Sequence, residues 1–202
     1  MSLFKKIFGN KKTDSSDQQT ERSKYMPEIE TPIDEKFILN FNKNGGKFLY
    51  CENFDEILIN YNNILQENNW QNANAFVTNK SLEQKFSNFP VNYVSEINGK
   101  PVSYFFTTCE NLIANDGSIL ISSNQIKEKK LNELPDNFIV FATTSQMVNQ
   151  IGEGLRKIKH QNGEDIPTNI TTIKCFNLNK EKDFMTYGSS SKNLYLLLLE
   201  DL

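Results

Sequence analysis

One apolar run near the end of the chain constrains the fold more than any other feature of the sequence. Residues Leu194–Leu199 read LYLLLL, and an apolar run without alternation is typical of a strand that is buried on both faces. Such strands belong to parallel sheets whose two faces are covered by helices. We therefore predict an α/β fold in which a largely parallel central sheet lies between helical layers.

Strand and helix patterns alternate along the rest of the chain, as expected for such a layered sheet. The other predicted strands are residues 47–51, 73–78, 103–106, 118–122, 138–143 and 172–176. The spacing of apolar residues also predicts helices. One is capped by Thr31 and has Pro32 at its first helical position, and the next starts at Asn53 or Asp55. A short helix is capped by Ser81, and a long helix is capped by Thr144 or Ser145. Residues 109–114 fit a single helical turn.

The first thirty residues differ from the remainder. Residues 1–8 read MSLFKKIF and are amphipathic as a helix, whereas residues 10–24 are polar and lack large apolar side chains. We predict a flexible, basic N-terminal tail over residues 1–30 and one α/β domain over residues 31–202. The tail could contact a membrane surface or a partner, or it could fold only when docked.

Composition excludes several classes of function. The chain has 22 basic and 25 acidic residues, a net charge of −3, which argues against a nucleic-acid binder. It has no apolar run of the ~20 residues that a membrane-spanning helix needs. Phosphate-binding motifs of the GxGxxG and GxxxxGK[ST] types are absent. Because His160 is the single histidine, sites that need two histidines are excluded. We expect His160 itself to be solvated at a helix end.

The three cysteines, Cys51, Cys109 and Cys175, are far apart, and no CxxC motif occurs. A four-cysteine zinc or iron–sulfur site therefore cannot be built from this chain alone. We expect buried free thiols in a cytoplasmic protein, no metal site, and no cofactor held by this chain alone.

The segment 107–123 is the strongest candidate for a ligand site. It places threonines at the end of one predicted strand, a carboxylate after them, and an Asp-Gly turn at the start of the next strand. Ligands of open α/β sheets bind at loops beyond strand ends, but the same turn could be purely structural. The candidate ligand-binding residues are Thr107, Thr108, Asp116, Gly117 and Ser118, and the candidate catalytic carboxylates are Glu110 and Asp116.

Three segments resemble the lactate-utilisation (LUD) domain family, in its LutC-like branch. Gly117-Ser118-Ile119 matches the turn of that family that enters a strand. Pro135 and the strand residues Ile139–Phe141 match its proline and following strand, and residues 187–201, YGSSSKNLYLLLLED, look like its closing strand. The resemblance covers roughly residues 32–202.

This resemblance implies a fold like that of the sugar-isomerase and CoA-transferase (NagB/RpiA-like) superfamily. It also implies a role in oxidising L-lactate to pyruvate beside partner subunits that carry iron–sulfur clusters, with a small organic acid as a candidate ligand. The chain departs from the family in two places. Residues 170–177 replace a GPS-x-TADIE segment, and Asp116 replaces the threonine of the turn.

Three functions follow from these observations. The chain could be an accessory component of lactate oxidation, a degenerate non-catalytic scaffold or regulatory module, or a small-molecule transferase or isomerase of the same superfamily.

Overall fold

The structure, a computed structural model, describes residues 31–97, 99, 101–176 and 191–201. The predicted tail therefore lies outside the described residues. The helices are α2 (Ile33–Lys43), α3 (Phe54–Glu67), α4 (Lys80–Lys85), α5 (Ser123–Ile126) and α6 (Ile151–Asn162), with 3₁₀ turns η1 (Leu131–Glu133) and η2 (Thr144–Gln146). The strands are β1 (Lys47–Cys51), β2 (Asn74–Phe76), β3 (Asn92–Val94), β4 (Tyr104–Thr107), β5 (Asn111–Ile113), β6 (Ser118–Ile121), β7 (Asn137–Thr143), β8 (Met147–Val148), β9 (Thr171–Ile173) and β10 (Asn193–Leu199).

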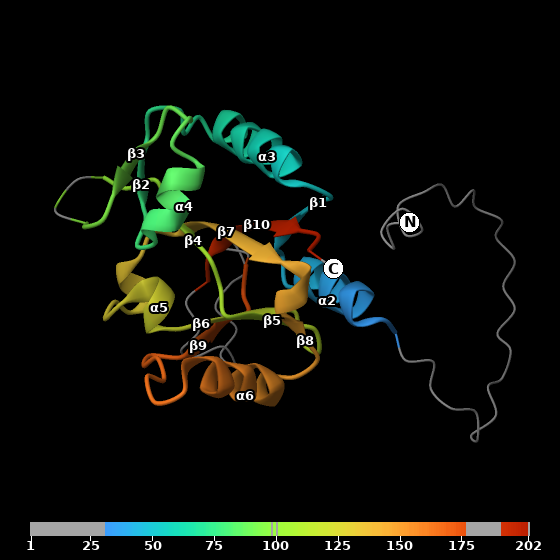
Figure 1. Ribbon diagram of the computed structural model, residues 1–202. Helices are drawn as coiled ribbons and strands as arrows, with labels where there is room; N and C mark the ends of the chain where they lie inside the picture. The colour runs from blue at the N-terminus through green and yellow to red at the C-terminus, as the bar shows by residue number, and fades with distance from the viewer. Residues whose placement is uncertain (1–30, 98, 100, 177–190, 202) are drawn as a thin grey trace, which may run out of the picture. The chain divides into compact units, whose positions relative to one another are not determined.

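A six-stranded sheet in the order β1-β10-β7-β4-β2-β3 forms the centre of the protein (Figure 1). All of its strand pairs are parallel. The apolar run lies in β10, paired on both sides, with Leu196 opposite Phe48 of β1 and Val140 of β7. Residues 194–198 are buried, which confirms the prediction of a parallel α/β sheet.

Aromatic side chains fill the layer between this sheet and α3. The Tyr61 ring of α3 lies 4.9 Å from the Phe106 ring of β4 and 4.8 Å from the Phe86 ring. Trp70, just after α3, stacks on Tyr104 at 4.7 Å. Helix α3 begins where predicted, because the Asn53 side chain accepts a hydrogen bond from the Glu56 amide and caps it.

A second sheet, in the order β8-β5-β6-β9, was not predicted. Its β5–β6 and β6–β9 pairs are antiparallel, and α6 packs on it through a small core of Ile113, Leu120, Val148 and Ile158. Figure 1 shows this sheet and α6 on the side of the central sheet away from α3. The second sheet and α6 therefore form two further layers on one face of the central sheet.

The second sheet also corrects two helix predictions. Residues 109–114 are not a helical turn, because Asn111–Ile113 pair with β6 and β8. The long helix starts at Ile151 and not at Thr144 or Ser145, because Met147 and Val148 pair with β5 first. Short strands of this kind take their conformation from cross-strand partners, which local periodicity does not reveal.

Two predicted helix starts shift by one or two residues. Asn79, not Ser81, caps α4, and its side chain accepts hydrogen bonds from the Ser81 and Leu82 amides. Pro32 occupies the capping position of α2 instead of its first helical position, so Thr31 does not cap that helix. Both helices nevertheless form where apolar spacing placed them.

Candidate functional site

The carboxyl edge of the central sheet contains the point where the direction of the chain reverses. From β2 the chain moves outward to β3, whereas from β4 it moves through the small sheet to β7 and then β10. The carboxyl ends of β2 and β4, which are neighbours, therefore lead in opposite directions. In open α/β sheets this is the position at which ligands bind.

Asp201 and Ser145 form the best-connected polar contact at this edge. Asp201 follows β10 and Ser145 follows the neighbouring β7, so parallel pairing brings them together. The Ser145 hydroxyl donates to Asp201 Oδ2 at 2.6 Å, and the Ser145 amide and the Thr144 hydroxyl donate to Oδ1 at 2.8 Å each. Burial raises the pKa of Asp201, but these hydrogen bonds outweigh it and hold the pKa at about 2. The carboxylate is thus ionised at neutral pH.

Gln146 connects this contact to the end of β4. Its Oε1 accepts a hydrogen bond from the Thr143 amide at 2.8 Å, and its Nε2 donates to the Cys109 carbonyl at 2.6 Å. The side chain therefore fixes the turn after β7 against the loop after β4.

Glu110 continues the same row toward β2. Its Oε1 accepts a 2.5 Å hydrogen bond from the Ser122 hydroxyl and a 2.9 Å bond from Asn124 Nδ2. Ser122 is buried and caps α5, and the Thr78 hydroxyl, just after β2, donates to the Gln125 carbonyl at 2.6 Å. We call the complete set the carboxyl-edge network; it comprises Thr78, residues 107–110, residues 122–125, residues 143–146 and Asp201.

Thr107 and Thr108 were predicted to bind a ligand, and they belong to this network. Thr107 is the last residue of β4 and is buried, and its hydroxyl donates to the Thr108 carbonyl at 3.2 Å. Thr108 is half-buried. Of these two threonines, Thr108 is the one whose side chain solvent can reach.

The predicted turn residues Asp116, Gly117 and Ser118 lie elsewhere, at the tip of the β5–β6 hairpin. Asp116 Oδ1 accepts hydrogen bonds from the Ser118 amide at 3.1 Å and the Ser118 hydroxyl at 2.7 Å. Helix α2 covers this tip: Asn44 Nδ2 donates to the Asp116 carbonyl at 2.6 Å, and Asn40 Nδ2 donates to the Ala114 carbonyl at 2.8 Å. Ser118 is buried.

Gly117 shows how closely α2 approaches the tip. Its φ is +67°, and a Cβ atom at this position would lie 2.4 Å from backbone atoms of Asn40 and Phe41. Only glycine combines this backbone conformation with such a contact. The tip is therefore a packed turn, and the hairpin places it at the opposite end from Glu110, whose amide bonds to the Leu120 carbonyl. The structure does not gather the six predicted residues into one cluster.

Sequence reasoning missed the half of the network that comes from other strands. Asp201, Ser145, Ser122 and Asn124 are the side chains concerned. Each follows an observed strand, β6, β7 or β10, by one to three residues, and a polar residue near a strand end is a usable signal. It becomes informative only when the strand order is known, because that order decides which strand ends are neighbours.

Among the described residues, no group of three or more His, Cys, Asp and Glu side chains could hold a metal ion. Cys51 and Cys109 are buried free thiols, and Cys175 is half-buried. Burial, with the nearby Glu110 carboxylate, raises the pKa of the Cys109 thiol. His160 is exposed in the last turn of α6.

A parallel α/β sheet with a polar carboxyl edge defines a broad class of ligand-binding proteins, and sequence comparison narrows it. The sequence profile of the LUD domain matches residues 98–199, about half of the chain. The chain belongs to the LUD domain family.

A solved structure supports the fold. The crystal structure of a DUF162 family protein from Deinococcus radiodurans superposes with a TM-score of 0.60 at 14% sequence identity. The match covers 84% of this chain and 96% of that one. No curated protein matches the sequence. None of the helices in the described part of the chain is long and apolar enough to cross a membrane.

Proposed function

We propose that this LUD-family protein is an accessory component of the oxidation of L-lactate to pyruvate, of the LutC-like branch, and that it works in the cytoplasm beside iron–sulfur subunits. Membership of a family associated with lactate utilisation carries this proposal. The carboxyl-edge network supports it, because a continuous row of polar side chains at a point of chain reversal suits binding more than folding alone.

The charge of the edge favours a partner surface over a free anion. Glu110, Glu200 and Asp201 carry negative charge there. Two lysines lie near this edge: Lys157 Nζ donates to the Ser145 carbonyl at 3.3 Å, and Lys85 Nζ lies 6.0 Å from the centre of the Phe141 ring. A free carboxylate ligand would meet repulsion, whereas a basic patch on a partner subunit would be attracted. A small organic acid could still bind through its hydroxyl group, with partner residues neutralising its carboxylate.

Two alternatives stay open. A degenerate scaffold or regulatory module would use the same domain without chemistry at the edge. A transferase or isomerase of the sugar-isomerase and CoA-transferase superfamily would need a catalytic carboxylate, and Glu110 is placed for that role more favourably than Asp116. Glu110 lies at the carboxyl edge, whereas both Asp116 Oδ1 hydrogen bonds stay within its own turn.

Deletion of the gene followed by growth on L-lactate as sole carbon source tests the proposal. We expect growth on L-lactate to fail while growth on pyruvate continues, because only the oxidation step is lost. Normal growth on L-lactate without the protein would contradict an accessory role.

Complementation of that deletion separates the alternatives. Wild type and Asp165→Asn, a matched charge change at an exposed site on another part of the domain, should restore growth. We expect Glu110→Gln and Asp201→Asn to restore it poorly, at unchanged protein levels. Full rescue by both edge variants would instead favour the scaffold.

A further inference from the structure

A separate cavity of about 240 Å³ lies between the edge strand β1, its neighbour β10 and helix α3. Its walls include Lys47, Leu49, Asn63, Ile64, Glu67 and Tyr195. Lys47 and Tyr195 are paired at the start of the β1–β10 ladder, so this amino-side cleft lies away from the carboxyl-edge network. Its volume is below the ~300–1,000 Å³ of drug-sized sites, which suits a small metabolite.

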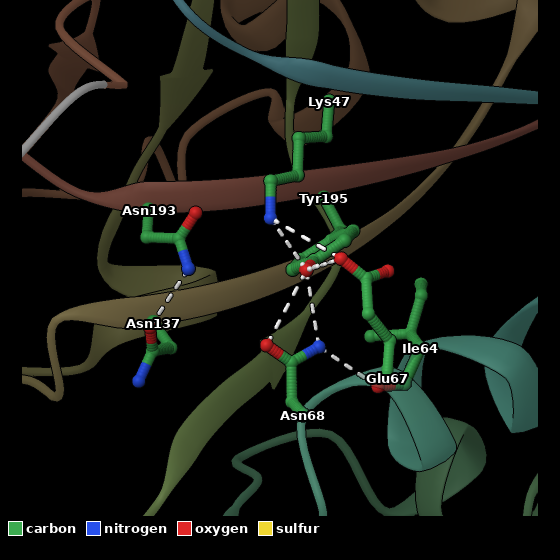
Figure 2. Close-up of polar contacts among 7 residues, drawn as sticks. All are labelled: Lys47, Ile64, Glu67, Asn68, Asn137, Asn193 and Tyr195. Atoms are coloured by element: carbon green, nitrogen blue, oxygen red, sulfur yellow. Dashed lines mark hydrogen bonds and ion pairs between the residues drawn. The ribbon is translucent and has the colours of Figure 1, made fainter.

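A buried phenol forms the floor of the cleft. Tyr195 is 2% exposed, and its hydroxyl accepts hydrogen bonds from Lys47 Nζ at 2.6 Å and from Asn68 Nδ2 at 3.0 Å. The same hydroxyl donates to Glu67 Oε1 at 3.1 Å. Figure 2 shows Lys47, Asn68 and Glu67 converging on this one oxygen. The contacts fix the phenol and hold a cation and an anion on either side of it.

Contacts to a ligand can replace the ion pair between Lys47 and Glu67. The distance between Lys47 Nζ and Glu67 Oε1 is 3.7 Å, and their side chains are 46% and 63% exposed. An ion pair this exposed contributes little, so a ligand can replace it at small cost. A lysine ammonium has three donors, and the Tyr195 hydroxyl takes one of those on Lys47.

Charge balance identifies the class of ligand. Of the described residues that line the cleft, Lys47 and Glu67 carry the formal charges, and they cancel. A simple carboxylate or a hydroxy acid would occupy Lys47 and leave Glu67 with the Tyr195 hydroxyl but no positively charged partner. A zwitterion satisfies both groups, and Leu49 and Ile64 offer an apolar wall for a side chain.

We propose that the amino-side cleft binds a small apolar α-amino acid. Its carboxylate contacts Lys47, its ammonium group contacts Glu67, and its side chain packs on Leu49 and Ile64. The inference is independent of the proposed role in lactate oxidation, since it uses none of the carboxyl-edge residues.

Titration of the full chain with L-valine, followed by NMR of the backbone amides, tests this proposal. We expect shifts confined to residues 47–49, 60–67 and 195. Two analogues of valine isolate the ammonium group: L-2-hydroxy-3-methylbutanoate replaces it with a hydroxyl, and 3-methylbutanoate lacks it. Both should bind at least tenfold more weakly than valine. Equal binding of the hydroxy acid, or no shifts in these segments at saturating valine, would overturn the proposal.

Variants assign the two charges. Lys47→Met should weaken valine binding at least tenfold, whereas Lys159→Met, the same change on the exposed surface of α6, should not. Glu67→Gln should weaken valine at least tenfold and leave the hydroxy acid unaffected, because a glutamine oxygen still accepts from a hydroxyl. Lys47 and Glu67 are both well exposed, so we expect these variants to fold. Undiminished valine binding by folded Lys47→Met or Glu67→Gln would overturn the assignment.

Discussion

The hairpin tip at residues 115–118 and the carboxyl-edge network both contain a hydrogen-bonded Asp–Ser pair, but the first is part of a packed turn and the second is open to solvent. At the tip, Asp116 and Ser118 bond to each other, Ser118 is buried, and Asn44 at the end of α2 bonds the Asp116 carbonyl. At the edge, Asp201 and Ser145 bond across two strands and remain exposed. The difference lies in what covers each pair. An Asp–Ser contact therefore marks a turn when another element closes over it, and a candidate site when solvent or a partner can reach it.

Gly117→Ala should produce the largest effect and shows how rigidly the tip is packed. The new Cβ would lie 2.4 Å from the α2 backbone, in a left-handed conformation. We expect the free energy of unfolding to fall by about 3 kcal/mol or more, from backbone strain and overpacking together. Urea denaturation measures this change.

Gly163→Ala is the matched control for that variant. Its φ is +57°, but no atom lies within 4 Å of a Cβ built there. Its ψ is −113°, a conformation that side chains rarely adopt, so the substitution should cost only the conformational part, about 1–3 kcal/mol, and less than Gly117→Ala. Equal losses in the free energy of unfolding for the two variants would show that α2 moves to accommodate the new methyl group. The tip would then not be a rigidly packed turn.

Most of the fold was predictable because its signals are local. The apolar run of β10 and the spacing in α3 are readable along the chain itself. The strands β5 and β8 were not, because three residues and two residues carry too little pattern and depend on their partners. The second sheet was missed for this reason.

The site was predictable by residue type but not by position. Thr107 ends strand β4 of the central sheet, Thr108 and Glu110 follow it, and the structure places all three at the carboxyl edge. Asp116 and Gly117 follow in sequence, but the hairpin carries them away and α2 packs on their backbone. Neither the reversal of the hairpin nor the docking of α2 has a signal within the segment.

Asn40→Ala removes one of the side chains by which α2 holds the hairpin. Asn40 Nδ2 donates to the carbonyls of Ala114 at 2.8 Å and Asn115 at 3.1 Å. We expect a loss of about 1–2 kcal/mol in the free energy of unfolding, since both carbonyls lose a donor. Asn42→Ala, on an exposed position of the same helix, carries the same gain in helix propensity and isolates the hydrogen bonds. If both variants were equally stable, α2 would not hold the tip through Asn40.

Asp201→Asn tests the carboxyl-edge network through the pH dependence of the free energy of unfolding. Because the pKa of Asp201 is about 2 in the folded protein, against an ordinary 3.8, its ionised form stabilises the fold above pH 4. We expect the variant to lose about 1 kcal/mol at pH 7, a value reduced because the carboxylate is exposed and screened. The difference from wild type should vanish as the pH falls from about 4 to 2. A difference independent of pH would mean that the charge of Asp201 is not what its neighbours stabilise.

Lys174→Met should have the smallest effect and completes the comparison. Lys174 Nζ lies 3.6 Å from Asp116 Oδ2, with the two side chains 57% and 40% exposed. Such a pair contributes about 0–0.5 kcal/mol, so unfolding in low and high salt should differ little between variant and wild type. The reason is that packing by α2 and the Ser118 hydrogen bonds already fix Asp116. A salt-dependent loss above about 1 kcal/mol would show that an exposed charge holds the tip. The tip would then depend on electrostatics as the edge does, and the distinction between a packed turn and an open site would fail at Asp116.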